Sequence, residues 1–457
     1  MKITIKNLGV LESAEYELGD LTVVCGKNNT GKTYAAYALY GFLNYWRNEH
    51  EFQVNTELFD EMQNNAEVLI AQEQIRDWLP KNLEQACKKY CSEQLPKSLG
   101  YSSDFLELFK NCEFSVNVDE TSIPLFDPKE RFRIIVPNRI GSDGSYDIKI
   151  IPDTDGKSLK IHKQYQQIAQ KISFNPAKFL PRFISKEILP HASFASADRI
   201  GAAMFSNEIR YLRDELYQKN ENSFDRMPID YPLPVSTNLN TIRDSLLSQP
   251  RLIDDIKDVF SDLLGGNFKS VNGKLYFIPS NNNNLSLTVT ESSSSVRSLL
   301  SLWLQLCNET RQMNFPKMFM IDEPEMNLHP ENQCLLARIF ARLVNVGYKI
   351  YITTHSDYIV KELNTLIILN RRNKNNDDIM KQYGYSEKEF LDPNKVRVYM
   401  AQEIETEKKT NYSPPPKCTF IRADIDELGI DLPSFDTTID RMNRIQMELL
   451  AGDDDDE

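Results

Sequence analysis

The pattern of apolar and polar positions along the chain predicts buried strands that alternate with helices. Continuous apolar runs at 21–25, 317–321 and 349–352 are typical of strands that are covered on both faces of a sheet. Helical spacing follows the first two of these runs, at 33–46 and at 330–343. This alternation predicts an α/β fold.

Shorter elements surround this framework. A further apolar stretch predicts a helix over 296–307, and two charged segments with helical spacing, 48–128 and 205–265, predict helical insertions. The predicted short strands cover 2–6, 14–18, 132–137, 146–151, 158–162, a segment that begins at 191, and a hairpin of 274–279 with 285–290.

The composition is that of a globular protein, with 41% hydrophobic and 26% charged residues. The 457 residues allow two or three structural units, at roughly 100–200 residues each. The sequence contains no run of 18 apolar residues and no apolar leader, so we expect neither a membrane span nor a signal peptide. Seven scattered cysteines fit a reducing compartment, so we expect a cytoplasmic location. The net charge of −13 argues against a dedicated DNA-binding protein.

A glycine-rich turn joins the strand at 21–25 to the helix at 33–46. Its pattern, G-x-x-x-x-G-K-T, is that of a phosphate-binding loop, in which backbone N–H groups and a helix N-terminus face the phosphates. We expect Lys32 to place its charge near the β- and γ-phosphates and the Thr33 hydroxyl to reach Mg²⁺. The residues predicted to bind the nucleotide are Gly26, Lys27, Asn28, Asn29, Thr30, Gly31, Lys32 and Thr33.

Two other predicted strands end in residues that suit hydrolysis. The strand at 317–321 runs into Asp322 and Glu323, and this pair provides separate groups for holding a metal and for activating water. The strand at 349–352 leads to His355, whose neutral imidazole is predicted to contact the γ-phosphate and to position Glu323. We therefore predict Lys32, Glu323 and His355 as catalytic residues, and Thr33 and Asp322 as metal-binding residues.

These three motifs, in this order, resemble those of ABC-type ATPases with SMC-like and RecF-like heads. The resemblance lies in separate blocks at 1–33, 319–333 and 352–360, the last of which reads ITTHSDYIV. It implies an α/β ABC-type head with a mixed central sheet and helical insertions. It also implies ATP and Mg²⁺ as cofactors, and a slow or regulated ATPase activity.

The resemblance suggests a division of the chain. The predicted parts are an ATPase lobe with the phosphate loop at 1–47, a helical insertion at 48–128, a continuation of the lobe at 129–204, a helical segment at 205–265, a second lobe with the signature, Walker B and switch histidine at 266–370, and a C-terminal region with an acidic tail at 371–457.

Two elements match the family less cleanly, and we find no convincing Q-loop glutamine. The family's signature turn contacts the γ-phosphate bound to the other subunit, and the resemblance assigns this role to Ser293, Ser294 and Ser295; a plain N-cap is the alternative. If the assignment holds, the site is shared between two copies. Arg199 ends a segment that resembles an A-[ED]-R motif of the OLD-like branch. It either approaches the nucleotide or the partner head, or is an ordinary surface arginine.

Missing features narrow the resemblance further. The chain lacks the long heptad segments of SMC proteins, and we predict no TOPRIM nuclease domain after His355, because Asp424-Ile425-Asp426 is interpreted as a strand-end turn. The pattern of blocks resembles that of stand-alone OLD-like ATPases of bacterial anti-phage systems, most of all the ATPase subunit of PARIS and more distantly that of Septu. Both of these act with a separately encoded nuclease.

This resemblance implies a sensor and scaffold protein with three kinds of partner. The partners are a second copy of the chain in a head dimer or a higher-order ring, a trans-encoded TOPRIM-type nuclease effector, and a phage-encoded trigger protein. No membrane partner is expected, and DNA binding stays open. The alternatives are a RecF-like DNA repair ATPase, a transporter's ATPase subunit, and a scaffold that has lost ATPase activity.

Overall fold

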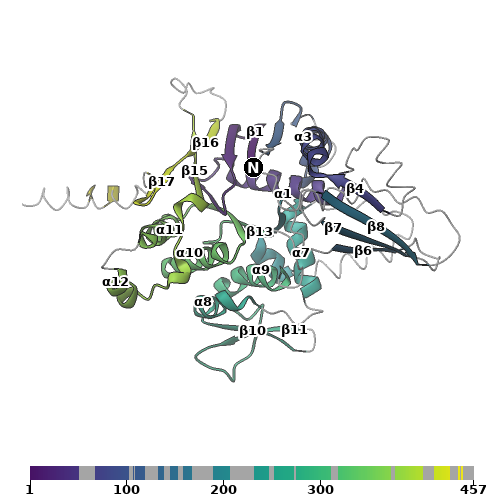
Figure 1. Ribbon diagram of the computed structural model, residues 1–457. Helices are drawn as coiled ribbons and strands as arrows, with labels where there is room; N and C mark the ends of the chain where they lie inside the picture. The colour runs from purple at the N-terminus through teal and green to yellow at the C-terminus, as the bar shows by residue number, and fades with distance from the viewer. Residues whose placement is uncertain are drawn as a thin grey trace, which may run out of the picture.

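The structure is a computed structural model, shown in Figure 1. It describes residues 1–50, 67–101, 107, 109–118, 132–137, 145–152, 158–166, 189–205, 231–245, 252–271, 274–309, 317–371, 376–404, 416–432, 441–442 and 444–445. The acidic tail predicted at 453–457 and large parts of the predicted insertions lie outside these residues. In the described part of the chain, no helix combines the length and the apolar character needed to cross a membrane.

The largest element is a mixed sheet that contains nine described strands. From one edge to the other they are β5 (Glu113–Asn117), β1 (Lys2–Leu8), β2 (Leu11–Glu17), β16 (Cys418–Arg422), β15 (Val396–Glu403), β3 (Leu21–Gly26), β14 (Lys349–Thr354), β13 (Lys317–Asp322) and β9 (His191–Ala195). The strands from β15 to β9 are all parallel to one another, so their carboxyl ends lie together along one side of the sheet, which is called its carboxyl edge below.

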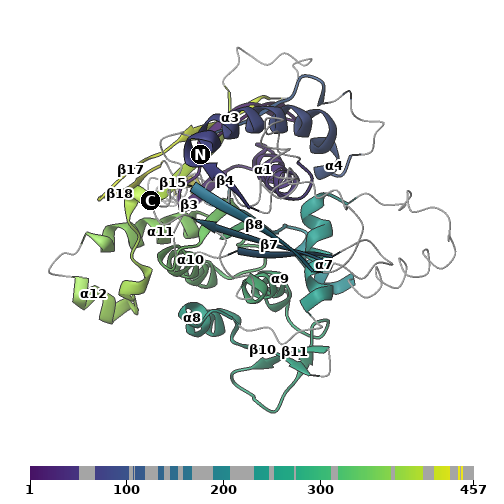
Figure 2. The same ribbon diagram turned by 45° about the vertical axis from the view of Figure 1, so that its right-hand side comes forward.

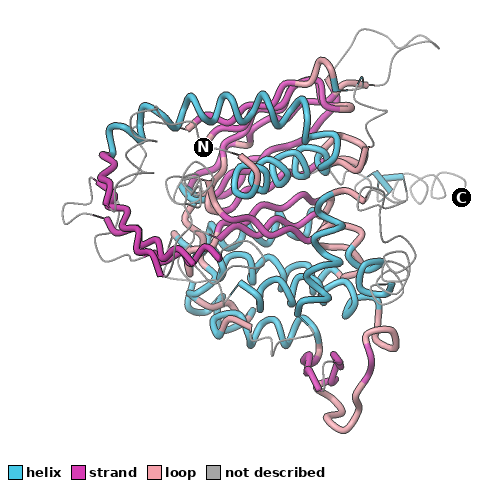
Figure 3. The backbone as a smooth tube through the Cα atoms, turned by 90° about the vertical axis from the view of Figure 1, so that its right-hand side faces the viewer, coloured by secondary structure: helices cyan, strands magenta, loops and turns pink. Residues whose placement is uncertain are grey.

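Helices cover both faces of this sheet, as Figures 1 and 3 show. On one face α1 (Lys32–Asn48) and α3 (Gln72–Lys89) contribute to a first apolar cluster, and on the other α8 (Asp254–Leu264), α9 (Ser294–Glu309), α10 (Pro330–Asn345) and α11 (Asp357–Asn370) contribute to a second. α7 (Leu233–Ser245) contacts both β9 and α9 at the edge of the sheet.

The central strands are continuous apolar runs because both of their faces are covered. In β13, Met318 and Met320 belong to the first cluster, whereas Phe319 and Ile321 belong to the second. Side chains of a strand point alternately to opposite faces, so a two-sided strand must be apolar at every position. The predicted α/β fold is confirmed, and the three apolar runs are the strands β3, β13 and β14.

A second sheet lies to the right of α1 and α7 in Figure 1, and it contacts α3 through its first strand. Its antiparallel strands run in the order β4 (Glu67–Ala71), β8 (Ser158–Gln166), β7 (Ser145–Pro152) and β6 (Phe132–Pro137). The sequence predicts β6, β7 and β8 but not β4. β4 and β5 both come from the segment at 48–128, which we expected to be mainly helical; α3, the π-helix η1 (Tyr90–Gln94) and α4 (Leu95–Ser98) supply the helical part of that segment.

The remaining elements are small and lie toward the periphery in Figure 2. β11 (Lys274–Pro279) pairs with β12 (Leu287–Thr288) as the predicted hairpin, and β10 (Gly266–Val271), which was not predicted, extends it. Asp424-Ile425-Asp426 forms β17 (Asp424–Asp426), which pairs with β18 (Gly429–Asp431) in a two-stranded hairpin. The others are α12 (Asn376–Tyr383) and the short 3₁₀ turns η5 (Glu387–Glu389) and η6 (Pro393–Lys395).

The C-terminal segment contributes to the centre of the sheet. β15 and β16 both come from 371–457, and β15 inserts directly beside β3. The sequence analysis predicts neither strand and treats this segment as a separate region. The proposed domain boundaries stay predictions, but the strand that flanks the phosphate loop comes from the far end of the chain.

Candidate nucleotide-binding site

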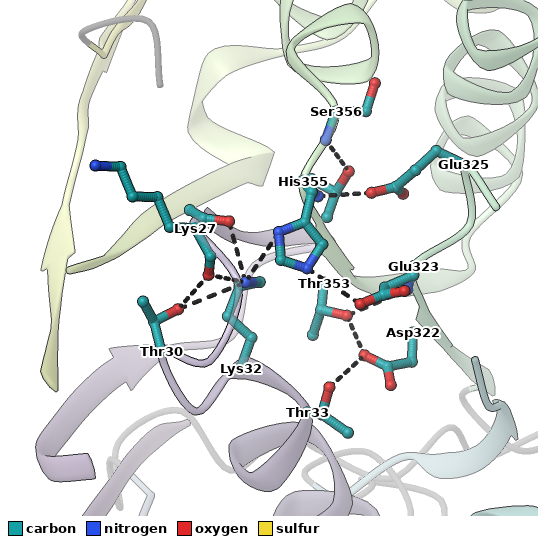
Figure 4. Close-up of polar contacts among 12 residues, drawn as sticks. Lys27, Thr30, Lys32, Thr33, Asp322, Glu323, Glu325, Thr353, His355 and Ser356 are labelled. Atoms are coloured by element: carbon teal, nitrogen blue, oxygen red, sulfur yellow. Dashed lines mark hydrogen bonds and ion pairs between the residues drawn. The ribbon is translucent and has the colours of Figure 1, made fainter. Parts of the chain in front are cut away.

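The predicted site residues gather at the carboxyl edge of the parallel strands. β3 leads into the phosphate loop, β13 ends at Asp322, and β14 leads to His355. β14 lies between β3 and β13, so the three strand ends are neighbours. Figure 4 shows the side chains of these segments pointing toward one another.

The phosphate loop requires glycine at two positions. Gly26 has a φ of 133°, and a Cβ atom there would lie 2.4 Å from the carbonyl oxygen of Ala401 in β15. Gly31 has a φ of 86° and is the N-cap of α1. Side chains are disfavoured at such φ values, and the glycines let the chain turn so that the first N–H groups of α1 face outward. This loop and helix N-terminus suit a bound phosphate group.

Lys32 is buried at the centre of the loop, with 4% of its surface exposed. Its ammonium group donates to the carbonyl oxygens of Gly26 at 3.0 Å and Lys27 at 2.7 Å. Burial lowers the pKa of Lys32 to about 8, although the carboxylates of Glu323 and Asp322 act in the opposite direction. The loop therefore holds a partly desolvated cation beside the helix N-terminus.

Asp322 has the environment expected of a metal ligand. Its Oδ1 accepts hydrogen bonds from Thr353 and, at 3.2 Å, from Thr33. Its Oδ2 is buried and has no hydrogen-bond partner among the described residues. Burial raises the pKa of Asp322 to about 6. An unpartnered carboxylate oxygen beside a hydroxyl fits Mg²⁺, which prefers oxygen ligands; bound there, the ion would neutralise phosphate charge.

Glu323 is held in an uncommon backbone conformation, with a φ of 49°. Its N–H donates to the carbonyl oxygen of Thr353 at 3.1 Å. Its carboxylate Oε1 lies 3.1 Å from Nε2 of His355, and this hydrogen bond lowers the pKa of Glu323. The group is therefore an ionised carboxylate at neutral pH, as a general base must be.

His355 connects the lysine to the glutamate. Its Nδ1 lies 3.4 Å from the ammonium of Lys32, which is a donor, so Nδ1 acts as the acceptor. Nε2 then carries the proton and donates to Glu323. The backbone N–H of His355 donates to the buried carboxylate of Glu325 at 2.6 Å. The expected contact between His355 and Glu323 is present, and its catalytic role stays a prediction.

The serine turn lies at the N-terminus of α9. Ser293 Oγ accepts from the N–H of Val296 at 3.3 Å and lies 2.8 Å from Ser295 Oγ. This is the geometry of a helix N-cap, the alternative that the sequence leaves open. Ser293 and Ser294 are also exposed to solvent. The structure does not bring them to the phosphate loop of the same chain, and their role toward a second copy stays a prediction.

Arg199 differs from both sequence-based interpretations. It is neither at the surface nor directed at a nucleotide, because only 2% of it is exposed and its guanidinium donates to backbone carbonyl oxygens. Two of these acceptors are Asp322 and Glu323, at 2.8 Å each. The sequence shows an arginine after a strand, but not that β9 pairs with β13 and so brings the two strand ends together.

Thr353 contributes to the site although no role was expected for it from the sequence. Its hydroxyl donates to Asp322, and both its carbonyl and its hydroxyl oxygen accept from the N–H of Glu323. The consecutive threonines before His355 were the available signal, since hydroxyls at the end of a buried strand need polar partners.

The family follows from a comparison of the sequence with protein-family models. Residues 1–360 match the family AAA_15, described as an AAA ATPase domain. The chain belongs to this family of AAA ATPase domains. The motifs at Lys32 and Asp322 lie inside the matched range, as does His355. No curated protein matches the chain.

Several solved structures of SMC heads are similar to this AAA ATPase domain. An SMC head bound to the C-winged helix domain of ScpA shares 11% identity at a TM-score of 0.36, over 93% of this chain and 98% of that chain. The SMC head domain from Thermotoga maritima shares 9% identity at a TM-score of 0.32, with the same coverage. An SMC head from Pyrococcus furiosus, with an extended coiled coil and bound to the C-terminal domain of ScpA, shares 10% identity at a TM-score of 0.32, over 97% of this chain and 98% of that chain.

Proposed function

We propose that this protein binds ATP with Mg²⁺ and hydrolyses it at the carboxyl edge of β3, β13 and β14. The observation that carries the proposal is the connected series of Lys32, His355 and Glu323, with Asp322 beside it. The contacts of the phosphate loop join distant parts of the chain, since Lys32 and His355 are 323 positions apart and Thr33 and Asp322 are 289 positions apart. A series of this kind, next to a phosphate loop, suits phosphoryl transfer to water.

Each group has a defined task in this reaction. Lys32 and the N-terminus of α1 stabilise the negative charge of the phosphates. Glu323 accepts the proton of the attacking water, and His355 donates from Nε2 to hold the glutamate in place. Asp322 and Thr33 are the residues that would hold the metal ion.

The serine turn supports a site that is completed by a second copy. Ser293 and Ser294 are exposed at the N-terminus of α9, where N–H groups and hydroxyls are available to an anion. In this proposal they contact the γ-phosphate bound to the partner of a head dimer. The expected result is that Glu323→Gln protein with ATP sediments as a dimer or larger; a strictly monomeric mass would exclude the shared site.

The resemblance to stand-alone OLD-like ATPases supports a biological role for this ATP hydrolysis. We infer that the protein is the sensor and scaffold of a bacterial anti-phage complex, and that its ATP cycle controls a separately encoded TOPRIM-type nuclease. A phage-encoded protein is the trigger in this proposal. The net charge of −13 makes a protein partner a better fit than a nucleic acid.

Purification of the chain expressed from its native operon tests the role directly. A nuclease that co-purifies in fixed proportion, identified by mass spectrometry, is the expected result. The RecF-like DNA repair function would be favoured instead by two results together. The chain would purify as a homo-oligomer without a partner, and it would bind duplex DNA in the presence of ATP with an affinity that falls steeply as the salt concentration rises.

A further inference from the structure

We propose that Arg199 is a positioning residue for ATP hydrolysis, which holds the backbone of Glu323 and links it to helix α9. The inference rests on the proposed ATPase function, and it gives Arg199 a role that differs from contact with the nucleotide or with a partner head. Arg199 contacts the backbone carbonyl oxygens of Asp322 and Glu323 rather than their carboxylates. It therefore acts through Glu323 and not on the nucleotide.

Four backbone carbonyl oxygens accept hydrogen bonds from this one side chain. Nη1 donates to Ser196 at 3.1 Å and to Asp322 at 2.8 Å, and Nη2 donates to Glu323 at 2.8 Å. Nε donates to Ser298 in α9 at 3.0 Å. A planar guanidinium with five N–H donors suits this arrangement, whereas an ammonium group has three donors at a single point.

The charge of Arg199 is buried without a hydrogen-bonded carboxylate among the described residues. Burial lowers the pKa of Arg199, while the nearby carboxylates of Glu325, Asp322 and Glu323 oppose this effect. A buried charge is costly unless it is compensated. Here the carbonyl dipoles and the field of three carboxylates compensate it, and the guanidinium occupies none of the carboxylate oxygens.

The contacts of Arg199 fix a backbone that would otherwise be unfavourable. Glu323 has a φ of 49°, which persists only where the surroundings determine it strongly. Thr353 holds the N–H of Glu323 from one side, and Arg199 holds its carbonyl from the other. Without the guanidinium, the carbonyl of Glu323 keeps only the longer hydrogen bond from the N–H of Met326, at 3.2 Å.

The same side chain reaches the helix that carries the serine turn. Ser298 lies one turn inside α9, and its carbonyl accepts from Arg199 while its hydroxyl donates to Met326 at 3.0 Å. Met326 in turn donates its N–H to the carbonyl of Glu323 at 3.2 Å. A shift of α9 would therefore be transmitted from Ser298 to the backbone of Glu323 by two routes, one through Arg199 and one through Met326.

The test compares two buried arginines in the full-length protein. Arg199→Met removes the N–H donors and keeps the apolar stem, and Arg342→Met is the matched control, because Arg342 is also buried but binds Glu389 and Asp258. We expect Arg199→Met to lower kcat by about 10²-fold, as a misplaced catalytic group does, while the Kd for ATP with Mg²⁺ changes by less than about threefold. We expect Arg342→Met to keep the wild-type kcat.

A second pair of measurements covers the case in which Arg199→Met does not fold. Arg199→Lys keeps the charge but cannot reach the four carbonyls together, so its kcat should fall by about tenfold or more at an unchanged Kd. Added methylguanidinium should restore part of the kcat of Arg199→Ala, and ammonium should not. A purely structural role predicts no such rescue.

The outcomes separate this inference from the proposed function. If Glu323→Gln is inactive while Arg199→Met and Arg199→Lys turn over at the wild-type rate, the positioning role is wrong and the ATPase site stands. If both Arg199 variants lose ATP binding together with kcat, Arg199 is merely structural and the inference is overturned. If Glu323→Gln hydrolyses ATP normally, the proposed function itself fails.

Discussion

Among the residues that the structure describes, two arginines are buried, and they are compensated in opposite ways. Arg342, in α10, donates to the carboxylates of Glu389 at 2.8 Å and Asp258 at 2.9 Å. Arg199, at the site, donates to backbone carbonyl oxygens although Asp322 and Glu323 are adjacent. Away from the site, carboxylates neutralise the cation and tie α10 to α8 and η5. At the site, the guanidinium binds backbone carbonyl oxygens only, and Oδ2 of Asp322 has no hydrogen-bond partner among the described residues.

This difference predicts that substitutions near Glu323 change turnover, whereas substitutions near Arg342 change stability. Glu323→Gln should show the largest effect, lowering kcat by ~10²–10⁴ because the general base is lost. ATP binding should be retained, since the amide keeps the shape of the side chain. Single-turnover hydrolysis and nucleotide retention measure this, and near-normal hydrolysis would refute the assignment of the base.

Arg342→Met should show the reverse pattern. It leaves Glu389 buried without its partner, and removing one member of a buried ion pair costs about 3–5 kcal/mol of the free energy of unfolding. Urea denaturation measures the loss, and kcat measured at low temperature should match the wild type. A stable variant with impaired turnover would show that the two regions are not separate.

Lys32→Ala should weaken ATP binding by about 2–5 kcal/mol, since a buried charged partner of the phosphates is removed. Titration calorimetry with ATP and Mg²⁺ checks this value. The substitution also takes a desolvated cation out of the loop, so we expect no loss of stability in urea. An unchanged Kd would mean that the phosphates do not bind at this loop.

The smallest effect concerns pH. The pKa of Lys32 is lowered to about 8 by burial, and bound phosphates favour its charged form, so binding raises this pKa. Affinity for ATP should fall above about pH 8 by about tenfold per pH unit, until the pKa of the bound state is reached. Lys32→Ala should lack this dependence. The same slope in both proteins would assign the titration to another group.

Local pattern was sufficient for much of the site. The glycines of the loop, the acidic pair after β13 and the histidine after β14 each follow an apolar run, and the contact between His355 and Glu323 was expected from that order, whereas the contact between Lys32 and His355 was not. The local sequence pattern did not predict the strands β4, β5 and β15. Short strands in charged or unpunctuated segments carry no periodicity that distinguishes them from helices or loops.

The sequence by itself determined which residues are able to bind phosphate, hold a metal ion and activate water, because these depend on residue type and on short spacings. Only the tertiary structure decided the neighbours of those residues. It placed β15 beside β3, where the Ala401 carbonyl leaves room only for glycine at position 26. It also placed β9 beside β13, which brings the guanidinium of Arg199 to the backbone carbonyl of Glu323. Strand order arises from packing between distant segments, and no local pattern of side chains encodes it.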